Sequence, residues 1–413
     1  MRMGAMLSEP SCRLCGGMVR KVLDLGRQPV SNAFVKPEET ERVPFYQLEV
    51  GLCTSCTMVQ QLNAVPPNEM YRADYPYRAS GSSMIRMHGE DVARHILETC
   101  PGGRDRFVVE VGSNDGVMLK TVSNAGMRHL GVDPAAAAGE VARRQGINVR
   151  TDFFNESTAA KIRDEHGPAH IIYSANTISH ISYLDSIFRG VDLLLASNGL
   201  FVIEDRYLGD ILKCVYFDQI YDEHIYLFSV GSVRALAARF GLELVDAQHL
   251  DLHGGTIRYT IARAGLRDPS PNVTDLLAHE KAAGIAEEAT FARFSARIDE
   301  IRRDLVSLLS DLRSDGMRVV GYGATSRSAT VMNYCNIGPD LIPIVCDSTP
   351  EKQGCLTPGS KVPVCSPDAF ADPYPDYALL FAWNHAEEIM AKERLFREKG
   401  GRWILYAPQV HLV

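Results

Sequence analysis

Hydrophobic and polar positions between residues 107 and 264 follow two periods in turn. Short apolar runs of strand length are followed by stretches with helical spacing, which predicts repeated strand–helix units and a mainly parallel sheet. The expected strands are Phe107–Val111, His129–Asp133, Asn148–Thr151, His170–Ser174, Leu200–Glu204, Glu243–His249 and Thr256–Arg263. No clear helical segment separates the last two, so we expect them to form an antiparallel hairpin that closes the sheet.

A long amphipathic helix is predicted after this region. Apolar residues recur there at alternating spacings of three and four, which places them on one helical face. They are Phe291, Phe294, Ile298, Ile301, Leu305, Leu308 and Leu312. A packing helix that bridges two domains explains this stripe better than a free coiled coil.

A second strand–helix pattern begins after Gly316. An apolar run ends in Gly321-Tyr322-Gly323-Ala324 and is followed by a predicted helix at Ser326–Tyr334. Further strands are expected at Leu341–Asp347, Tyr377–Ala382 and Arg402–Tyr406. The pattern predicts a smaller Rossmann-type domain. It could be a diverged duplicate of the first, although no residue-level repeat is visible.

The length and charge of the chain limit the classes of protein it can belong to. At 413 residues it exceeds one ordinary core, so two or three domains are expected. The net charge of −8 argues against a nucleic-acid coat, which needs an extended basic face. The longest apolar stretches are too short or too interrupted to span a bilayer, and the N-terminus has no apolar signal core. We therefore expect a cytoplasmic protein with no membrane partner.

Four of the ten cysteines form two C-x-x-C pairs near the N-terminus, Cys12 with Cys15 and Cys53 with Cys56. Two such pairs complete the tetrahedral shell of one zinc ion and leave no open position for water. Residues 1 to about 74 contain several prolines and little helical periodicity, so a small β-rich module organised by metal fits. Redox dithiols are the alternative. We interpret the pairs as a structural zinc site.

The turn after the first predicted strand is the strongest functional signal in the chain. The run Phe107–Val111 contains Glu110 and then breaks into glycines at Gly112 and Gly116. Backbone without a Cβ lets a nucleotide-like ligand approach closely, and Asp133 at the end of the next strand can accept hydrogen bonds from ribose hydroxyls. The pattern lacks the dinucleotide G-x-G-x-x-G. It is similar to the first two motifs of S-adenosylmethionine-dependent methyltransferases.

Proton-handling side chains gather after two later strands. The segment 216–226 contains Tyr221, Asp222, Glu223 and His224, and it follows a strand that ends in Glu204-Asp205. A histidine there can move a proton near neutral pH, and a neighbouring carboxylate or phenol can orient its ring. His180 follows the fourth strand in the same way. Each of these histidines could instead be a structural or loop residue, and His253 before the last strand is read mainly as part of a turn.

The turn of the C-terminal domain is a candidate anion site. It lies between a strand and a helix N-terminus, where free backbone N–H groups and Arg327 can bind a phosphate. Asp347 ends the next strand, and Lys352, Asn384 and His385 lie on the same predicted edge. A turn with no ligand, or one that binds NAD, are the alternatives.

Together these motifs resemble the sugar C-methyltransferase family, whose members act on nucleotide-linked 4-keto-6-deoxy sugars. The resemblance covers the two C-x-x-C pairs, Val109–Gly116, Tyr221–His224, His253–Arg258 and Gly321–Thr325. It extends to the C-3 methyltransferases of the D-tetronitrose type of nitrosugar pathway. The implied fold is α/β, with a zinc-binding module at 1–74, a Rossmann-like methyltransferase domain at 75–285 and a Rossmann-like sugar-nucleotide domain at 286–413. A monomer that binds S-adenosylmethionine, zinc and a dTDP-4-keto-deoxysugar is expected.

The resemblance also implies roles for individual residues. His224 is the expected base for the C-3 proton, with Glu223 orienting it and Tyr221, His180 and Tyr75 holding the ketone oxygen. The expected cofactor contacts are Glu110, Gly112, Asn114, Asp115, Gly116, Asp133, Ala175 and Asn176. The expected substrate contacts are Tyr77, Tyr322, Arg327, Asp347, Lys352 and Asn384. Two alternatives stay open, an O- or N-methyltransferase on a sugar nucleotide and a non-catalytic zinc and sugar-nucleotide binding protein.

Overall fold

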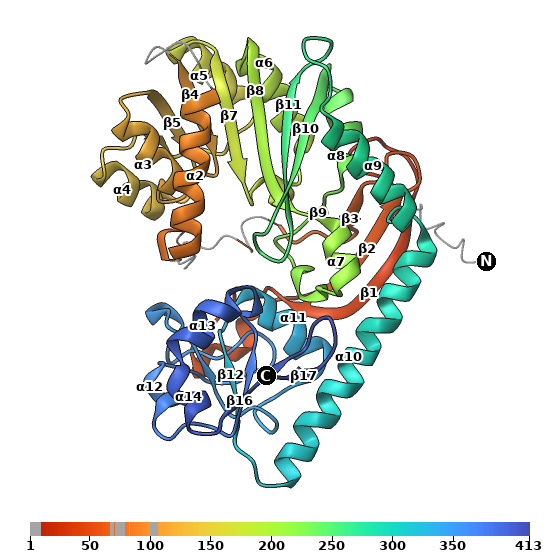
Figure 1. Ribbon diagram of the computed structural model, residues 1–413, viewed down its shortest axis with the longest axis vertical. Helices are drawn as coiled ribbons and strands as arrows, with labels where there is room; N and C mark the ends of the chain where they lie inside the picture. The colour runs from red at the N-terminus through yellow and green to blue at the C-terminus, as the bar shows by residue number, and fades with distance from the viewer. Residues whose placement is uncertain (1–9, 67–69, 71–78, 82, 100–105) are drawn as a thin grey trace, which may run out of the picture.

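The computed structural model describes residues 10–66, 70, 79–81, 83–99 and 106–413. Tyr75 and Tyr77 lie outside these residues. The described chain forms three sheets, of four, seven and six strands. Figure 1 shows the seven-stranded sheet above, the C-terminal domain below, and the long curved strands of the N-terminal sheet between them. The expected α/β class is confirmed, and the expected bounds of its three parts stay a prediction.

The central sheet has the order β10-β11-β8-β7-β4-β5-β6. Neighbours from β8 to β6 are parallel, whereas β11 is antiparallel to β8 and to β10, as the missing helix between the last two strands predicted. The strands are β4 Phe107–Val111, β5 Arg128–Val132, β6 Val149–Arg150, β7 Ala169–Ala175, β8 Leu195–Arg206, β10 Leu242–Leu250 and β11 Thr256–Arg263. The carboxyl ends of the parallel strands meet at one edge of the sheet.

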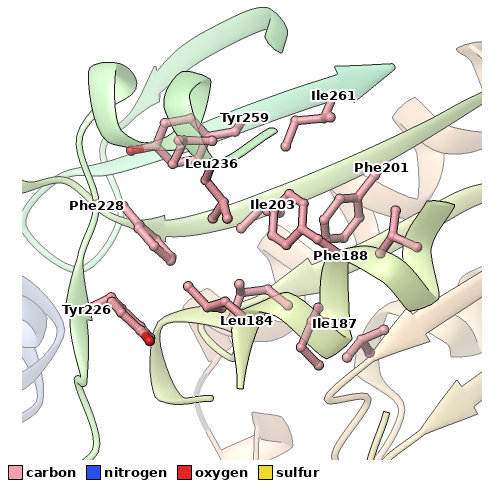
Figure 2. Close-up of a cluster of buried hydrophobic side chains, with 14 of the residues drawn as sticks. Leu184, Ile187, Phe188, Phe201, Ile203, Tyr226, Phe228, Leu236, Tyr259 and Ile261 are labelled. Atoms are coloured by element: carbon pink, nitrogen blue, oxygen red, sulfur yellow. The ribbon is translucent and has the colours of Figure 1, made fainter. Parts of the chain in front are cut away.

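Helices cover both faces of this sheet (Figure 1). They are α2 Ser83–Thr99, α3 Val117–Asn124, α4 Ala136–Arg144, α5 Glu156–His166, α6 Leu184–Leu194, α8 Val230–Ala238 and α9 Pro271–Ala283. The short helix α7 Leu208–Cys214 lies below the sheet in Figure 1 and shares an apolar cluster with α10 (Glu288–Ser314). Figure 2 shows how apolar side chains fill one of the layers, with Phe188 of α6 against Phe201 of β8. Their ring centres lie 5.6 Å apart in an edge-to-face arrangement, and both residues are fully buried. Burial of each contributes about 1.5–3 kcal/mol.

The N-terminal sheet is antiparallel and has the order β1-β2-β3-β9. Its strands are β1 Val19–Pro29, β2 Phe45–Cys53, β3 Val59–Gln61 and β9 Tyr226–Leu227. The fourth strand therefore comes from the central part of the chain. Apolar side chains of the same sheet, such as Leu23 and Val50, share a buried cluster with α10 (Glu288–Ser314). The zinc-binding module is thus packed into the rest of the protein.

The C-terminal sheet has the order β14-β13-β12-β15-β16-β17 and is parallel except for β17. Its elements are β12 Val319–Tyr322, α11 Ser326–Tyr334, β13 Val345–Cys346, β14 Val364–Cys365, α12 Asp368–Ala371, β15 Tyr377–Leu380, α13 Ala386–Lys392, α14 Arg394–Glu398, β16 Arg402–Leu405 and β17 His411–Leu412. The helix α10 reaches this domain as predicted. Its stripe passes through Leu309, which is fully buried, rather than Leu308, which is only partly buried. No helix in the described part of the chain has the length and apolar character of a membrane span.

Candidate active site and metal centre

The glycine turn after β4 is tight because a side chain has no room there. Gly112 has φ +75°, and a Cβ at this position would lie 2.2 Å from Oγ1 of Thr177. Gly116 has φ +82° and precedes α3, where a Cβ would meet Ile147 at 2.4 Å. Left-handed backbone and close approach both require glycine. The turn therefore presents bare backbone at the carboxyl edge of the sheet.

Asp133 holds this turn to the next one. Its Oδ2 accepts the backbone N–H of Asn114 at 2.8 Å, and its Oδ1 accepts that of Ala135 at 2.8 Å. Burial raises the pKa of this carboxyl, and the two N–H donors oppose the rise. Each oxygen keeps a second lone pair, so the predicted contact to a ribose hydroxyl fits the geometry.

Buried acceptor atoms surround the glycine turn. Within the described residues, Oε2 of Glu110, Oδ1 of Asp115 and Oδ1 of Asn176 are buried without a hydrogen-bond partner. They come from the ends of the neighbouring strands β4 and β7, where Ala175 is the last residue of β7. Buried polar atoms are normally paired, so these three suit a ligand that brings donors. Burial also raises the pKa of Glu110 well above its usual value, and a cationic ligand group would reverse that shift.

A second cluster lies around His224, whose side chain is 2% exposed. Its Nδ1 is bonded to the main-chain carbonyl oxygen of Gln219. The imidazole rings of His224 and His180 are 4.9 Å apart, and the ring of Tyr221 is 4.1 Å from that of His224. The structure therefore brings together three of the predicted catalytic side chains.

The charge state of this cluster follows from burial. Burial lowers the pKa of His224 well below its ordinary value, and the positive charge of Arg206 lowers it further. The same two causes lower the pKa of His180 to about 3. Burial raises the pKa of the Tyr221 hydroxyl. At neutral pH the cluster thus holds neutral imidazoles and a protonated phenol.

The carboxylates next to His224 point to the N-terminal module. Oδ1 of Asp222 accepts the backbone N–H of Ser31 at 3.0 Å, and Oε1 of Glu223 accepts Nδ2 of Asn32 at 2.7 Å. The group that orients the ring of His224 through Nδ1 is thus a backbone carbonyl. The predicted orienting role of Glu223 stays a prediction.

Sequence reasoning missed Arg206, which is the last residue of β8. Its Nε and Nη1 are buried and have no hydrogen-bond partner in the described part of the protein. Its neighbour Asp205 binds both the backbone N–H and the hydroxyl of Ser179, next to His180. A signal for Arg206 is present in the sequence, because the buried strand ends in three charged residues, Glu204-Asp205-Arg206.

The turn after β12 in the C-terminal domain has the same pattern of hydrogen bonds as the glycine turn after β4. Oδ2 of Asp347 accepts the N–H of Ala324 at 2.7 Å, and its Oδ1 accepts that of Thr349 at 2.7 Å. Nζ of Lys352 donates to the carbonyl of Ala324 at 2.7 Å and lies 4.9 Å from the ring centre of Phe34. Asp347 therefore plays the same part here as Asp133 does in the central domain.

Arg327 lies next to a polar contact between the C-terminal and central domains. Its guanidinium carbon lies 5.0 Å from the ring centre of Trp383, and its Nη1 is buried with no partner among the described residues. Nε1 of Trp383 and the hydroxyl of Tyr406 both donate to Oδ2 of Asp218, at 2.6 and 2.7 Å. Tyr216 stacks on the same indole at 4.0 Å. This contact joins the loop before His224 to the C-terminal domain.

Two other predicted substrate residues differ in their surroundings. Tyr322 packs its ring against Phe370 and Trp403, and its hydroxyl donates to Glu393 at 2.7 Å. Asn384 is partly buried in a short turn beside Trp383. Tyr322 therefore has internal partners, whereas Asn384 lies next to the contact that Arg327 makes.

The four N-terminal cysteines form a closed cluster. All four sulfur atoms lie within 4.8 Å of one another, and the Cys12–Cys56 and Cys15–Cys53 separations are 3.6 and 3.4 Å. A tetrahedral Zn²⁺ with bonds of about 2.3 Å separates its sulfur ligands by about 3.8 Å. Backbone N–H groups of Leu14, Gly17 and Ser55 also point at the sulfurs. The cluster fits a structural zinc ion.

Three family models match successive parts of the chain. A zinc binding domain matches residues 12–71, a methyltransferase domain matches 85–247, and a C-methyltransferase C-terminal domain matches 251–408. The C-methyltransferase NovU of Streptomyces niveus is 34% identical over 97% of this chain and 96% of its own length. The chain belongs to the C-methyltransferase family. The enzyme thus uses S-adenosylmethionine to methylate carbon, and zinc is its structural metal.

Solved structures share only a broad likeness with the enzyme. A methyltransferase dependent on S-adenosylmethionine from Anabaena variabilis covers 43% of this chain and 85% of its own, at 16% identity and a TM-score of 0.35. The glycopeptide N-methyltransferase MtfA covers 42% of this chain and 94% of its own, at 9% identity and a TM-score of 0.33.

Proposed function

We propose that the enzyme methylates C-3 of a dTDP-linked 4-keto-deoxysugar, with His224 as the base. The observation that carries this proposal is the state of the imidazole. Because a carbonyl oxygen can only accept, the bond to Gln219 places the proton on Nδ1 and the lone pair on Nε2. In the described part of the chain Nε2 is buried and has no partner. A neutral imidazole with a free lone pair is what a base requires.

The reaction needs a base because a sugar carbon is a poor nucleophile. A ketone at C-4 acidifies the C-3 hydrogen, since the electron pair left behind moves onto the ketone oxygen. In this proposal Nε2 of His224 takes the C-3 proton. S-adenosylmethionine would supply an electrophilic methyl group when bound. The enolate electron pair forms the bond from C-3 to that methyl and restores the ketone, while the methyl–sulfur bond breaks and the neutral thioether, S-adenosylhomocysteine, leaves with its electron pair.

The charge that develops on the ketone oxygen needs donors. Arg206 offers Nε and Nη1, both buried without partners among the described residues, and Tyr221 offers a protonated hydroxyl next to His224. Donors fixed in a buried site stabilise such an oxygen strongly. We assign this role to Arg206 and Tyr221, with His180 and Tyr75 as further candidates.

We also propose that the sugar nucleotide lies between the central and C-terminal domains. Nη1 of Arg327 is buried without a hydrogen-bond partner in the described part of the protein. Its guanidinium lies over Trp383, which donates to Asp218 of the loop that precedes His224. A bidentate guanidinium suits a diphosphate. The other proposed contacts are Asp347, Lys352, Asn384 and Tyr77. We also propose that the zinc-binding module spans residues 1–74, the methyltransferase domain 75–285 and the sugar-nucleotide domain 286–413.

The test is turnover of a panel of dTDP-4-keto-deoxysugars, with mass detection of methyl gain in the presence of S-adenosylmethionine and of solvent deuterium at C-3 in its absence. We expect one member to gain a methyl group on carbon and to exchange its C-3 hydrogen. Methyl gain on oxygen or nitrogen, or turnover of a sugar without the ketone, would contradict the proposal.

A further inference from the structure

The buried side chain of Gln61 binds the backbone of the loop that carries His224. Its Nε2 donates to the carbonyl oxygens of Tyr221 at 2.6 Å and His224 at 2.9 Å, and the carbonyl of Asp222 lies at 3.3 Å. Its backbone N–H donates to the carbonyl of Ile225 at 2.8 Å. One residue of the N-terminal module thus bonds the loop on both sides of the imidazole.

The strand that carries Gln61 is fixed to the metal turn. Arg13 lies between the paired Cys12 and Cys15, and its guanidinium donates to the carbonyl oxygens of Gln61 and Leu62. Its backbone N–H also donates to Oε1 of Gln60 at 3.1 Å. The zinc turn and the loop of His224 are therefore joined through the three residues of β3.

The far side of the loop is fixed in the central domain. The loop runs directly into β9, which pairs with β3 through Val59 with Leu227 and Gln60 with Tyr226. Tyr226 and Phe228 lie in the apolar cluster of the central domain (Figure 2), and the hydroxyl of Tyr226 donates to the carbonyl of Ser182 at 3.1 Å. The loop of His224 is thus held by the N-terminal module on one side and by the central domain on the other. The side chain of Gln61 donates to carbonyl oxygens of this loop.

We propose that Gln61 is a positioning residue, through which the zinc-binding module sets the place of the His224 imidazole. The proposal rests on the proposed function, because it takes His224 as the base. Without the amide of Gln61, the buried carbonyl oxygens of Tyr221 and His224 lose a donor and the loop can shift. A shift of about 1 Å at a reacting group can lower the rate about a hundredfold.

The test compares Gln61→Met with Gln28→Met. Both glutamines are 2% exposed, and within the described residues the amide of Gln28 donates to the carbonyl of Leu25 in the same strand, at 2.8 Å. We expect Gln61→Met to keep its zinc content and its affinity for S-adenosylmethionine, while kcat falls about ten- to a hundredfold and KM changes less than threefold. Gln28→Met should keep the kcat of the parent. Equal loss of kcat in the two variants, or none in Gln61→Met, would overturn the proposal.

A second variant covers the case in which Gln61→Met does not fold. Asn32→Ala removes a half-buried amide whose Nδ2 donates to Oε1 of Glu223, on the same loop, at 2.7 Å. This variant should also lower kcat. An unchanged kcat in this variant would then overturn the proposal. His224→Ala separates the two proposals. If His224→Ala retains turnover, the proposed function fails; if only the Gln61 and Asn32 variants retain it, the positioning role alone fails.

Discussion

The main-chain carbonyl oxygen of Gln219 accepts a hydrogen bond from Nδ1 of His224, five residues along the same loop. The contact fixes both the tautomer and the plane of a ring that is 2% exposed. Burial and the charge of Arg206 lower the pKa of the imidazole, so it stays neutral through the physiological range. The imidazole is therefore held in the neutral state that the proposed base requires.

His224→Ala should lower kcat at least about a hundredfold, because general bases contribute about 10²–10⁴ in rate. The affinity for S-adenosylmethionine, measured by calorimetry, should stay within about twofold, since the predicted cofactor contacts lie at the ends of β4, β5 and β7 and not on the loop of His224. His95→Ala, at an exposed position of α2, is the matched control and should resemble the parent. Parental turnover in His224→Ala would remove the base from the mechanism.

Glu110→Gln should weaken binding of S-adenosylmethionine about tenfold. Glu110 is 7% exposed, and its carboxyl has a buried oxygen with no partner among the described residues, so a donor of the ligand can satisfy it. A hydrogen bond to a charged group is worth about 1.5–3 kcal/mol, and 1.4 kcal/mol is a factor of ten in affinity. Glu140→Gln, on the exposed face of α4, should bind as the parent does. Equal affinities in both variants would exclude Glu110 from the cofactor site.

Local patterns were enough to predict the elements of the two Rossmann-like domains. The strands 107–111 and 256–263 and the helix 326–334 have the predicted bounds. Their signal is short-range, since apolar period and turn residues lie within each segment. The strand predicted at 341–347 is shorter, at Val345–Cys346, because most of that segment has no neighbour to pair with.

Long-range pairing was not predictable in the same way. The bond from Gln61 to Tyr221 joins residues 160 positions apart, and β9 has only two residues. Neither leaves a periodic trace in the sequence. The equivalence of Asp133 and Asp347 was predictable only in part. The sequence places an aspartate at the end of a strand in both domains, but the hydrogen bonds that each accepts from backbone N–H groups leave no trace in the residue types. The cysteine cluster was predictable, since ligand type and spacing carry it.

Cys12→Ser should lose zinc and destabilise the whole protein. The cluster shares its apolar surroundings with the central domain, so loss of the metal loosens more than the module itself. Structural zinc contributes folding free energy directly. Metal analysis should show less than one zinc per chain, and thermal unfolding should move to lower temperature. Cys214→Ser, outside the cluster, is the control. A zinc-free Cys12→Ser protein with parental activity would contradict a structural role.

His180 should make the protein less stable in acid. Its folded pKa of about 3 lies below the unfolded value of 6.5, so below pH 6.5 the unfolded chain binds a proton that the folded chain does not. Between pH 7.5 and 5.5 this lowers the free energy of unfolding by about 1 kcal/mol. Denaturant unfolding of His180→Gln should show a fall that is smaller by this amount. Acids with raised pKa values, such as Asp222 at about 6, act in the opposite sense but are present in both proteins. Parallel pH profiles would show that His180 titrates normally.

Arg327→Gln should raise the KM for the dTDP-sugar about tenfold or more and change kcat less than threefold. The guanidinium has a buried donor with no partner in the described residues, and loss of a charge-assisted contact to a phosphate costs binding rather than chemistry. Burial raises the pKa of Asp218 and the charge of Arg327 opposes that rise, so the variant is measured well below its melting temperature. Arg397→Gln, exposed on α14 of the same domain, is the matched control. A parental KM together with a lower melting temperature would mean that Arg327 only balances the charge of Asp218, and the proposed diphosphate site would have to be sought elsewhere between the two domains.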